Sequence, residues 1–390
     1  MRNIVIAIAI VAAFIAGEIV YLKSGPSYGG LDKLASKIIS DCADAPYKPT
    51  CYEEEIPRLM NRISMEDAFK VTRFVQSMDR TYQYCHVLGH KIAAAETATD
   101  PARWQTVIQR CPSGVCSNGC IHGAFQERFR KESLTDDEIL KLKPQLSSVC
   151  EKKSGFNPTG LEQGSCYHAL GHLLMYITEA DVPKSLALCN EFSKKPTHDY
   201  SHVCYDGVFM QIYQPLEPDD FSLIEGKEVS REEVSAFCGA FTGEEAGSCY
   251  SESWPLFYED LRKPTNLLKF CAKPEGEKEQ RRCFDTLMYV MAAQFAFNNE
   301  KIFAYCEAMP TDFHKATCMA QAANRMIETD YSNGELATAV CERAEAYDKD
   351  HICFNDLLKY STFNFHKGSE PWKAFCNAMP EPWMARCLSR

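Results

Sequence analysis

The chain has 390 residues, of which 45% are hydrophobic, so it can bury a large core and is not expected to be disordered. Its formal net charge of -11 argues against a nucleic-acid partner, because proteins that bind nucleic acids usually present a basic surface to the phosphates.

The N-terminus indicates export. Arg2 precedes an apolar run over residues 4–22, which Gly17 and Glu18 interrupt. Such a run is long enough to span a bilayer, but its purely apolar part also has the length of a signal-peptide core. We predict a signal anchor at 1–23, with Arg2 on the cytoplasmic side, because no clean cleavage site follows the run. A cleaved signal peptide is the alternative.

Twenty cysteines support the same compartment, because disulfides persist in oxidising surroundings and are rare in the cytosol. No Cys-x2-Cys pair occurs, which argues against structural zinc knuckles. The predicted protein is therefore anchored to a membrane and faces the periplasm or the extracellular space, or is secreted if the signal is cleaved. After a linker at 24–31, residues 32–390 form one disulfide-rich domain.

The cysteines reveal an internal repeat. In the C-terminal half they form pairs 11 or 12 residues apart, which recur every 34 or 35 residues, and looser pairs continue toward the N-terminus. Cys85 and Cys116 are left over and are expected to bridge each other. The nine expected pairs are Cys42–Cys51, Cys111–Cys120, Cys150–Cys166, Cys189–Cys204, Cys238–Cys249, Cys271–Cys283, Cys306–Cys318, Cys341–Cys353 and Cys376–Cys387.

Each repeat is predicted to be a helical hairpin. In residues 299–330, apolar residues at helical spacing precede Pro310, Thr311 or Asp312 can cap a second helix, and apolar residues then recur every four positions. The cysteines lie late in the first helix and early in the second, so a disulfide would join the two helices across the turn. We expect an all-α protein, an α-solenoid of about ten stapled hairpins.

In its period and its hairpins, the domain at 32–390 resembles the tetratricopeptide-like class of helical repeats, although the tryptophan, glycine and tyrosine signature of that class is absent. The resemblance implies a curved rod with a concave partner-binding surface, and no particular chemistry. Two segments depart from the period: an extra polar helix at 130–147 and an acidic loop at 214–233. Both flank the histidine-bearing repeats at about 70–215, so we expect them to form walls or lids.

Five of the ten histidines fall in one row of these repeats. Counted from the second cysteine of a repeat, His122 and His168 lie at the second position and His172 lies at the sixth. The pair "HVLGH" aligns with "HALGH" if Cys85 is taken one place late. Spacing of four places a pair on one helix face, as in helices that bind zinc through two histidines. The candidate metal ligands are His86, His90, His122, His168 and His172.

Neutral imidazole suits copper, zinc or iron, and a bare ion is favoured over haem, because the chain has no Cys-x2-Cys-His attachment motif. His122 can complete either pair, and both a single ion and a close pair of ions remain open. Asp206 and Glu127 are weaker candidates near the row. The expected role is metal handling, redox chemistry or metal-dependent catalysis. The alternative is a metal-free scaffold that binds a partner protein or peptide, with histidines that serve packing alone.

Overall fold

A computed structural model describes residues 30–129, 134–153, 155–216 and 218–390. The predicted anchor at 1–23 lies outside these residues. Within the described ranges, no helix is long and apolar enough to cross a membrane. Apart from one two-stranded antiparallel ladder, β1 (Lys194–Lys195) with β2 (His198–Asp199), the regular structure of these residues is helical.

The helices form ten hairpins, and each hairpin has a first and a second helix. The first helices are α2 (Leu31–Asp41), α4 (Met65–Met78), α6 (Trp104–Arg110), α8 (Asp136–Val149), α10 (Val182–Ser193), α13 (Val234–Cys238), α16 (Pro264–Cys271), α18 (Asn299–Glu307), α20 (Gly334–Ala344) and α22 (Glu370–Asn377). The second helices are α3 (Lys48–Arg58), α5 (His86–Thr99), α7 (Gly119–Phe129), α9 (Gly160–Ile177), α11 (Ser201–Tyr213), α14 (Gly243–Glu252), α17 (Glu277–Gln294), α19 (Asp312–Thr329), α21 (Ile352–Asn364) and α23 (Trp383–Ser389).

Shorter helices lie between these hairpins and, in the case of η4, between the two helices of one hairpin. They are α12 (Pro218–Leu223), α15 (Tyr258–Leu261) and the single 3-10 turns η2 (Leu59–Asn61), η3 (Pro101–Arg103), η4 (Cys116–Asn118), η5 (Trp254–Phe257) and η6 (Tyr331–Asn333). The segment at 130–147, predicted to be an extra helix, in fact contains most of α8, which is the first helix of the hairpin closed by Cys150. The segment at 214–233 contains α12.

All ten predicted disulfides are confirmed. Nine of them join the two helices of one hairpin and close loops of 9 to 16 residues, each worth about 3 kcal/mol in the chain-entropy account. The tenth, Cys85–Cys116, has a different role, because it joins the start of α5 to η4 in the next hairpin. It therefore staples two repeats together.

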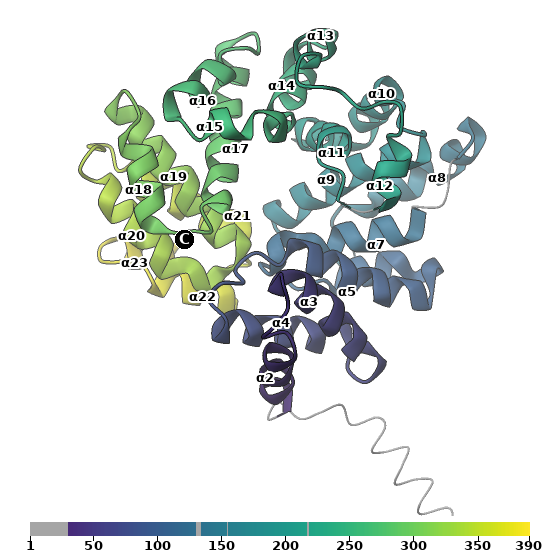
Figure 1. Ribbon diagram of the computed structural model, residues 1–390, viewed down its shortest axis with the longest axis horizontal. Helices are drawn as coiled ribbons and strands as arrows, with labels where there is room; N and C mark the ends of the chain where they lie inside the picture. The colour runs from purple at the N-terminus through teal and green to yellow at the C-terminus, as the bar shows by residue number, and fades with distance from the viewer. Residues whose placement is uncertain (1–29, 130–133, 154, 217) are drawn as a thin grey trace, which may run out of the picture.

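Each second helix packs against the second helix of the next hairpin, from α3 to α23. From α5 to α23 these contacts are more extensive than those between the corresponding first helices. In Figure 1 the second helices α9, α11, α17 and α21 lie toward the centre, while first helices such as α10, α16 and α18 lie at the periphery. Tighter packing on the inner side makes each repeat a wedge, so the row of hairpins curves strongly.

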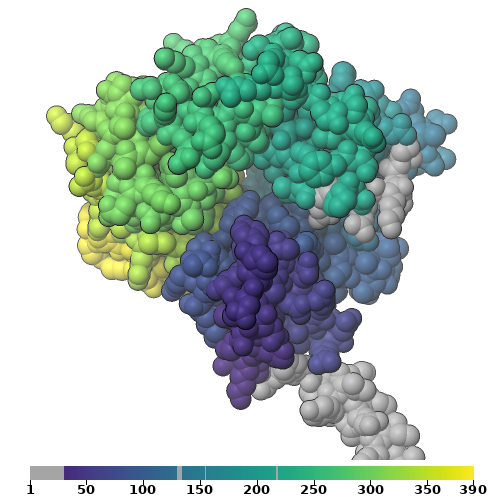
Figure 2. Space-filling model, in the orientation of Figure 1, coloured from purple at the N-terminus to yellow at the C-terminus, as the bar shows by residue number. Residues whose placement is uncertain are grey.

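The curvature brings the C-terminal repeats back onto the N-terminal ones. Helix α21 packs against α9, and Val115 forms an antiparallel bridge with Asp330. The guanidinium of Arg73 lies 4.3 Å from the ring centre of Tyr331. Figure 2 shows the yellow C-terminal repeats in contact with the blue N-terminal ones. The open curved rod implied by the resemblance is therefore wrong: the row of repeats closes on itself, and its inner face becomes an interior.

Candidate metal centre

The pair His86 and His90 occupies the first turns of α5, and His122 lies on the neighbouring helix α7. These two helices touch through backbone, because a Cβ atom at Gly119 would lie 2.2 Å from the His86 carbonyl oxygen and one at Gly123 would lie 2.1 Å from that of His90. Only glycine permits this approach. The close packing holds the imidazole of His122 beside the other two.

The second histidine pair is built in the same way. His168 and His172 lie on α9, which packs against α11. A Cβ atom at Gly171 would lie 2.1 Å from the Cys204 carbonyl oxygen, and one at Gly207 would lie 2.1 Å from that of His168. The glycines beside the histidines therefore serve close helix packing.

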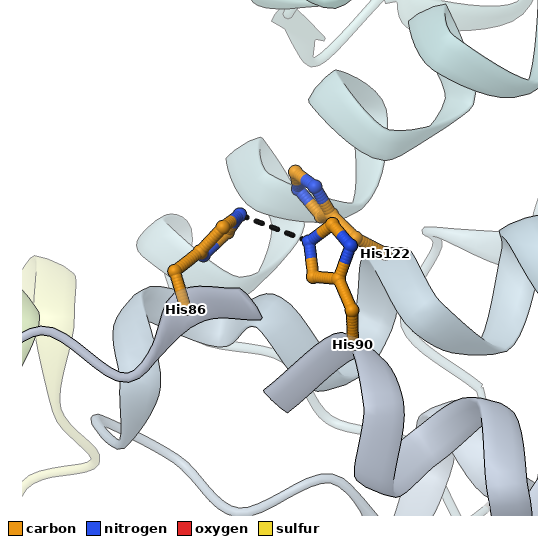
Figure 3. Close-up of side chains that lie close together, drawn as sticks. All are labelled: His86, His90 and His122. Carbon is orange, nitrogen blue, oxygen red and sulfur yellow. Dashed lines mark hydrogen bonds between the residues drawn. The ribbon is translucent and has the colours of Figure 1, made fainter. Parts of the chain in front are cut away.

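The five side chains predicted from the sequence converge. We call His86, His90, His122, His168 and His172 the histidine cluster. The ring of His122 lies at its centre, with ring centres 4.9 to 5.5 Å from those of the other four. Figure 3 shows the rings of His86 and His90 turned toward each other, with His122 behind them. Two triads result, His86–His90–His122 and His122–His168–His172, with nitrogen atoms within 4.8 Å of one another in each.

Within each pair the Nε2 atoms face each other. They are 3.0 Å apart in His86 and His90 and 3.3 Å apart in His168 and His172. Zinc binds imidazole nitrogen at 2.0–2.1 Å, so two nitrogens on one tetrahedral ion lie about 3.3 Å apart, and about 2.9 Å apart at a right angle. Both pairs therefore already have the separation of neighbouring ligands on one metal ion.

The cluster is buried and uncharged. His86, His90 and His122 are each 7% exposed, and His168 and His172 are half-buried. Burial lowers the pKa of all five imidazoles, that of His90 to about 3 and those of His86, His122 and His168 well below the usual value. Repulsion between neighbouring imidazolium charges adds to the effect in the pairs. Neutral imidazole is the form that binds metal ions, so near neutral pH the nitrogen lone pairs are available.

Outer partners orient the rings. His86 Nδ1 lies 3.3 Å from the Cys116 carbonyl oxygen, and His172 Nδ1 lies 2.8 Å from Gln211 Oε1. Gln211 donates from Nε2 to Asp220 Oδ1 over 2.8 Å, which leaves its Oε1 as an acceptor and assigns the proton of His172 to Nδ1. In both rings the Nε2 lone pair then faces the cluster. Such outer contacts are typical of histidine ligands.

Asp220 connects the two pairs. It is 5% exposed and lies on α12, and its Oδ1 also accepts from Gln126 Nε2 over 3.5 Å. Gln126 in turn hydrogen-bonds His90. One carboxylate therefore supports His90 and His172 through one glutamine each. The segment at 214–233 does form a wall of the site, as the sequence predicted.

The sequence analysis missed Gln126, Gln211 and Asp220 as supporting residues. A signal was present for Gln126, which occupies the position in its repeat that His172 occupies in the next. No signal marked Asp220, because it lies outside the periodic part of the chain. Neither Asp206 nor Glu127 contributes to either triad, and Asp206 instead lies 4.0 Å from Arg282.

A left-handed turn positions the acceptor for His86. Three successive residues without glycine, Cys116, Ser117 and Asn118, have φ values of 52°, 48° and 57°. This conformation costs roughly 1 kcal/mol or more per residue. The Cys85–Cys116 disulfide and the Val115–Asp330 bridge hold the turn from both sides. The closure of the row of repeats therefore helps to present the Cys116 carbonyl to His86.

No protein-family model matches the chain, and neither the curated proteins nor the solved structures give a match. The fold and the site define a class by themselves: an all-α, disulfide-stapled protein with a buried cluster of five neutral histidines that suits a metal ion.

Proposed function

We propose that this protein is an exported α-solenoid that holds one divalent transition-metal ion in its histidine cluster. The observation that carries the proposal is the convergence of five uncharged imidazoles. The paired Nε2 atoms are 3.0 and 3.3 Å apart, and the outer nitrogens of His86 and His172 are tied to protein acceptors. Histidines that serve only packing would not need to direct their ring nitrogens toward one common point. Ligands that are buried and already oriented favour a resident ion over a transiently carried one.

Charge decides between one ion and two. Two divalent ions bound to opposite nitrogens of His122 would lie about 6 Å apart. They would need His122 as the imidazolate anion, because a neutral imidazole has only one nitrogen lone pair to offer. At an effective dielectric constant of about 20 the two ions would repel each other by about 11 kcal/mol. The other ligands are neutral, and neither triad contains a carboxylate to offset this repulsion. One divalent ion per chain is therefore expected, with His122 as a ligand in either triad.

An all-imidazole site suits copper, zinc or iron, in accord with the preferences of these ions. Neutral ligands leave the full charge on the ion, which favours activation of a bound water or a change of redox state. Haem suits the site less well, because nitrogen atoms 3.0 to 3.3 Å apart leave no room for a macrocycle between them.

Metal content tests the proposal directly. We expect about one equivalent of zinc, copper or iron in the purified domain by elemental analysis, and less than about a tenth of that in His122→Ala, because both triads lose a member. His314→Ala is the matched control, since His314 lies on α19 outside the cluster. Circular dichroism checks that the variants fold. Absence of bound metal in the folded wild-type domain after incubation with each ion would leave the scaffold alternative standing.

The outer partners provide a second test. Gln211→Leu removes the acceptor of His172 Nδ1 and should weaken metal binding by about 10- to 100-fold, as loss of such partners typically does. Affinity is measured by competition with a chromogenic chelator. Gln163→Leu on α9 is a control without contact to the cluster, since its amide reaches Glu151. Equal effects of the two changes would contradict the role assigned to Gln211.

We also propose that residues 1–23 anchor the domain to a membrane from the outside. The ten disulfides support the oxidising side, because such bonds persist there. The full-length protein should remain in the membrane fraction after an alkaline wash and should lose its anchorage when residues 1–23 are deleted. Recovery of the full-length protein in the soluble exported fraction would favour a cleaved signal.

A further inference from the structure

A small cavity adjoins the histidine cluster, between α7, α9, α11 and the segment that carries α12. His90, His122 and His172 line it, so members of both triads face the same space. A metal ion bound by three histidines keeps an open coordination position, as catalytic zinc sites do. Two members of each triad line this cavity, so it is the space into which an open position at the proposed metal site can face.

The size of the cavity limits what can enter it. The space open to the centres of water-sized molecules is about 30 Å³. One water molecule needs about 10 to 15 Å³ by this measure, so the cavity holds about two or three. A ligand such as dioxygen, a peroxide or azide fits, whereas a five-membered ring does not.

The walls are held firmly. Phe125, Phe129 and Leu173 are buried and present apolar surface. Across from them, Asp220 accepts hydrogen bonds from Gln211 on α11 and from the backbone N–H of Leu216 over 2.9 Å. It also accepts from the hydroxyl of Tyr176 on α9. These bonds pin α12 to two second helices, so the cavity does not widen without breaking a buried network.

Leu216 forms the outer edge of the cavity. Its side chain lines the cavity and is also 47% exposed, so it lies between the interior and the solvent. Phe221, on α12, is 58% exposed but does not line the cavity. The two residues therefore form a matched pair for testing what limits access.

We infer that the metal centre accepts an exogenous ligand of at most three heavy atoms, of the dioxygen, peroxide or azide class, and excludes ring-sized ligands. This inference rests on the proposed metal site and adds the class of molecule that the ion meets. The limit comes from the cavity between the cluster and α12, and Leu216 sets its outer edge.

The test uses the domain loaded with one equivalent of Cu(II), with azide and imidazole as probes in visible and electron paramagnetic resonance spectra. Azide should produce a charge-transfer band at millimolar concentration, and imidazole at the same concentration should leave both spectra unchanged. Leu216→Ala should admit imidazole and change the azide affinity by less than about threefold. Phe221→Ala should behave as the wild type.

The outcomes separate this inference from the metal site itself. Imidazole binding to the wild type as tightly as azide would overturn the size limit, and so would a failure of both probes to perturb bound copper, because the position would then be closed. In both cases the metal site would stand. A failure of the folded domain to bind copper, zinc or iron would instead overturn the proposed function, and the inference with it.

Discussion

Without bound metal, the protein should lose stability steeply between pH 6.5 and pH 5. In the folded state the pKa of each of the five cluster histidines is lowered, that of His90 to about 3, whereas in the unfolded chain each has its usual value near 6.5. Below pH 6.5 the unfolded chain therefore binds up to five protons that the folded protein does not bind. Stability is full above pH 6.5 and is lost as the pH falls toward the folded-state values.

The expected size follows from linkage. Each histidine that stays neutral in the folded state costs about 1.4 kcal/mol by pH 5.5 and about 2 kcal/mol by pH 5. The four whose pKa lies well below the usual value, which are His86, His90, His122 and His168, therefore cost about 6 and about 8 kcal/mol. Such losses are comparable to the whole stability of a typical domain. Urea unfolding of the metal-free, oxidised domain between pH 7.5 and pH 5 measures the slope, and a slope that stays below about 2 kcal/mol per pH unit would contradict burial of the neutral cluster.

Single variants calibrate this slope. His122→Gln removes one group that binds a proton in the unfolded chain but not in the folded protein. It should therefore reduce the dependence of the unfolding free energy on pH by about 1.4 kcal/mol per pH unit below pH 6. His314→Gln is the matched control, because it replaces a histidine that lies outside the cluster, near the start of α19. An equal reduction of the pH dependence in both variants would show that the proton uptake on unfolding does not arise from the histidine cluster.

The second large effect concerns two glycines on one helix. Gly171→Ala in α9 should destabilise the protein by about 3 kcal/mol or more, because the new Cβ would lie 2.1 Å from the Cys204 carbonyl oxygen and 2.9 Å from the Val208 nitrogen. Both contacts are backbone, so no side chain can rotate away. Helices α9 and α11 must separate, which also displaces His168 and His172.

Gly164→Ala is the control in the same helix. A Cβ there would meet only the ring of Tyr200, at 3.6 Å, which is ordinary contact. Alanine is the better helix former by about 1 kcal/mol, so this change should be neutral or stabilising. In chemical denaturation we expect Gly171→Ala to lower the free energy of unfolding and Gly164→Ala to leave it unchanged or raise it. Metal affinity should fall only in Gly171→Ala. Equal small effects would show that α9 and α11 do not touch as closely as described.

The disulfide pairing was predictable because the repeat makes it a local problem. In nine cases the partners are at most 16 residues apart, on helices joined by one turn. Cys85–Cys116 followed by elimination. The helical hairpins were predictable for the same reason, since apolar spacing and Pro310 are local signals. The segment at 130–147 was misread because the longer spacing of Cys150 and Cys166 hid its place in the period.

The histidine row was predictable from register alone. Equivalent positions of equivalent helices face the same way, so His122 had to lie between the two pairs once the hairpins stacked in order. The structure brings all five together, and their role as ligands remains a prediction. The supporting residues were not predictable in the same way: Asp220 reaches Gln126 and Gln211 from a segment without a repeat partner.

The sequence by itself determined the hairpins, their ten staples and the row of imidazoles, because each of these depends on contacts within a repeat or between neighbouring repeats. Only the tertiary structure decided that the row closes and that Asp330 bridges Val115 beside a left-handed turn. It also placed α12 over the histidines. The row closes because each repeat is slightly rotated relative to the previous one. The sum of these rotations depends on every contact between neighbouring helices, so it cannot be read from any single residue.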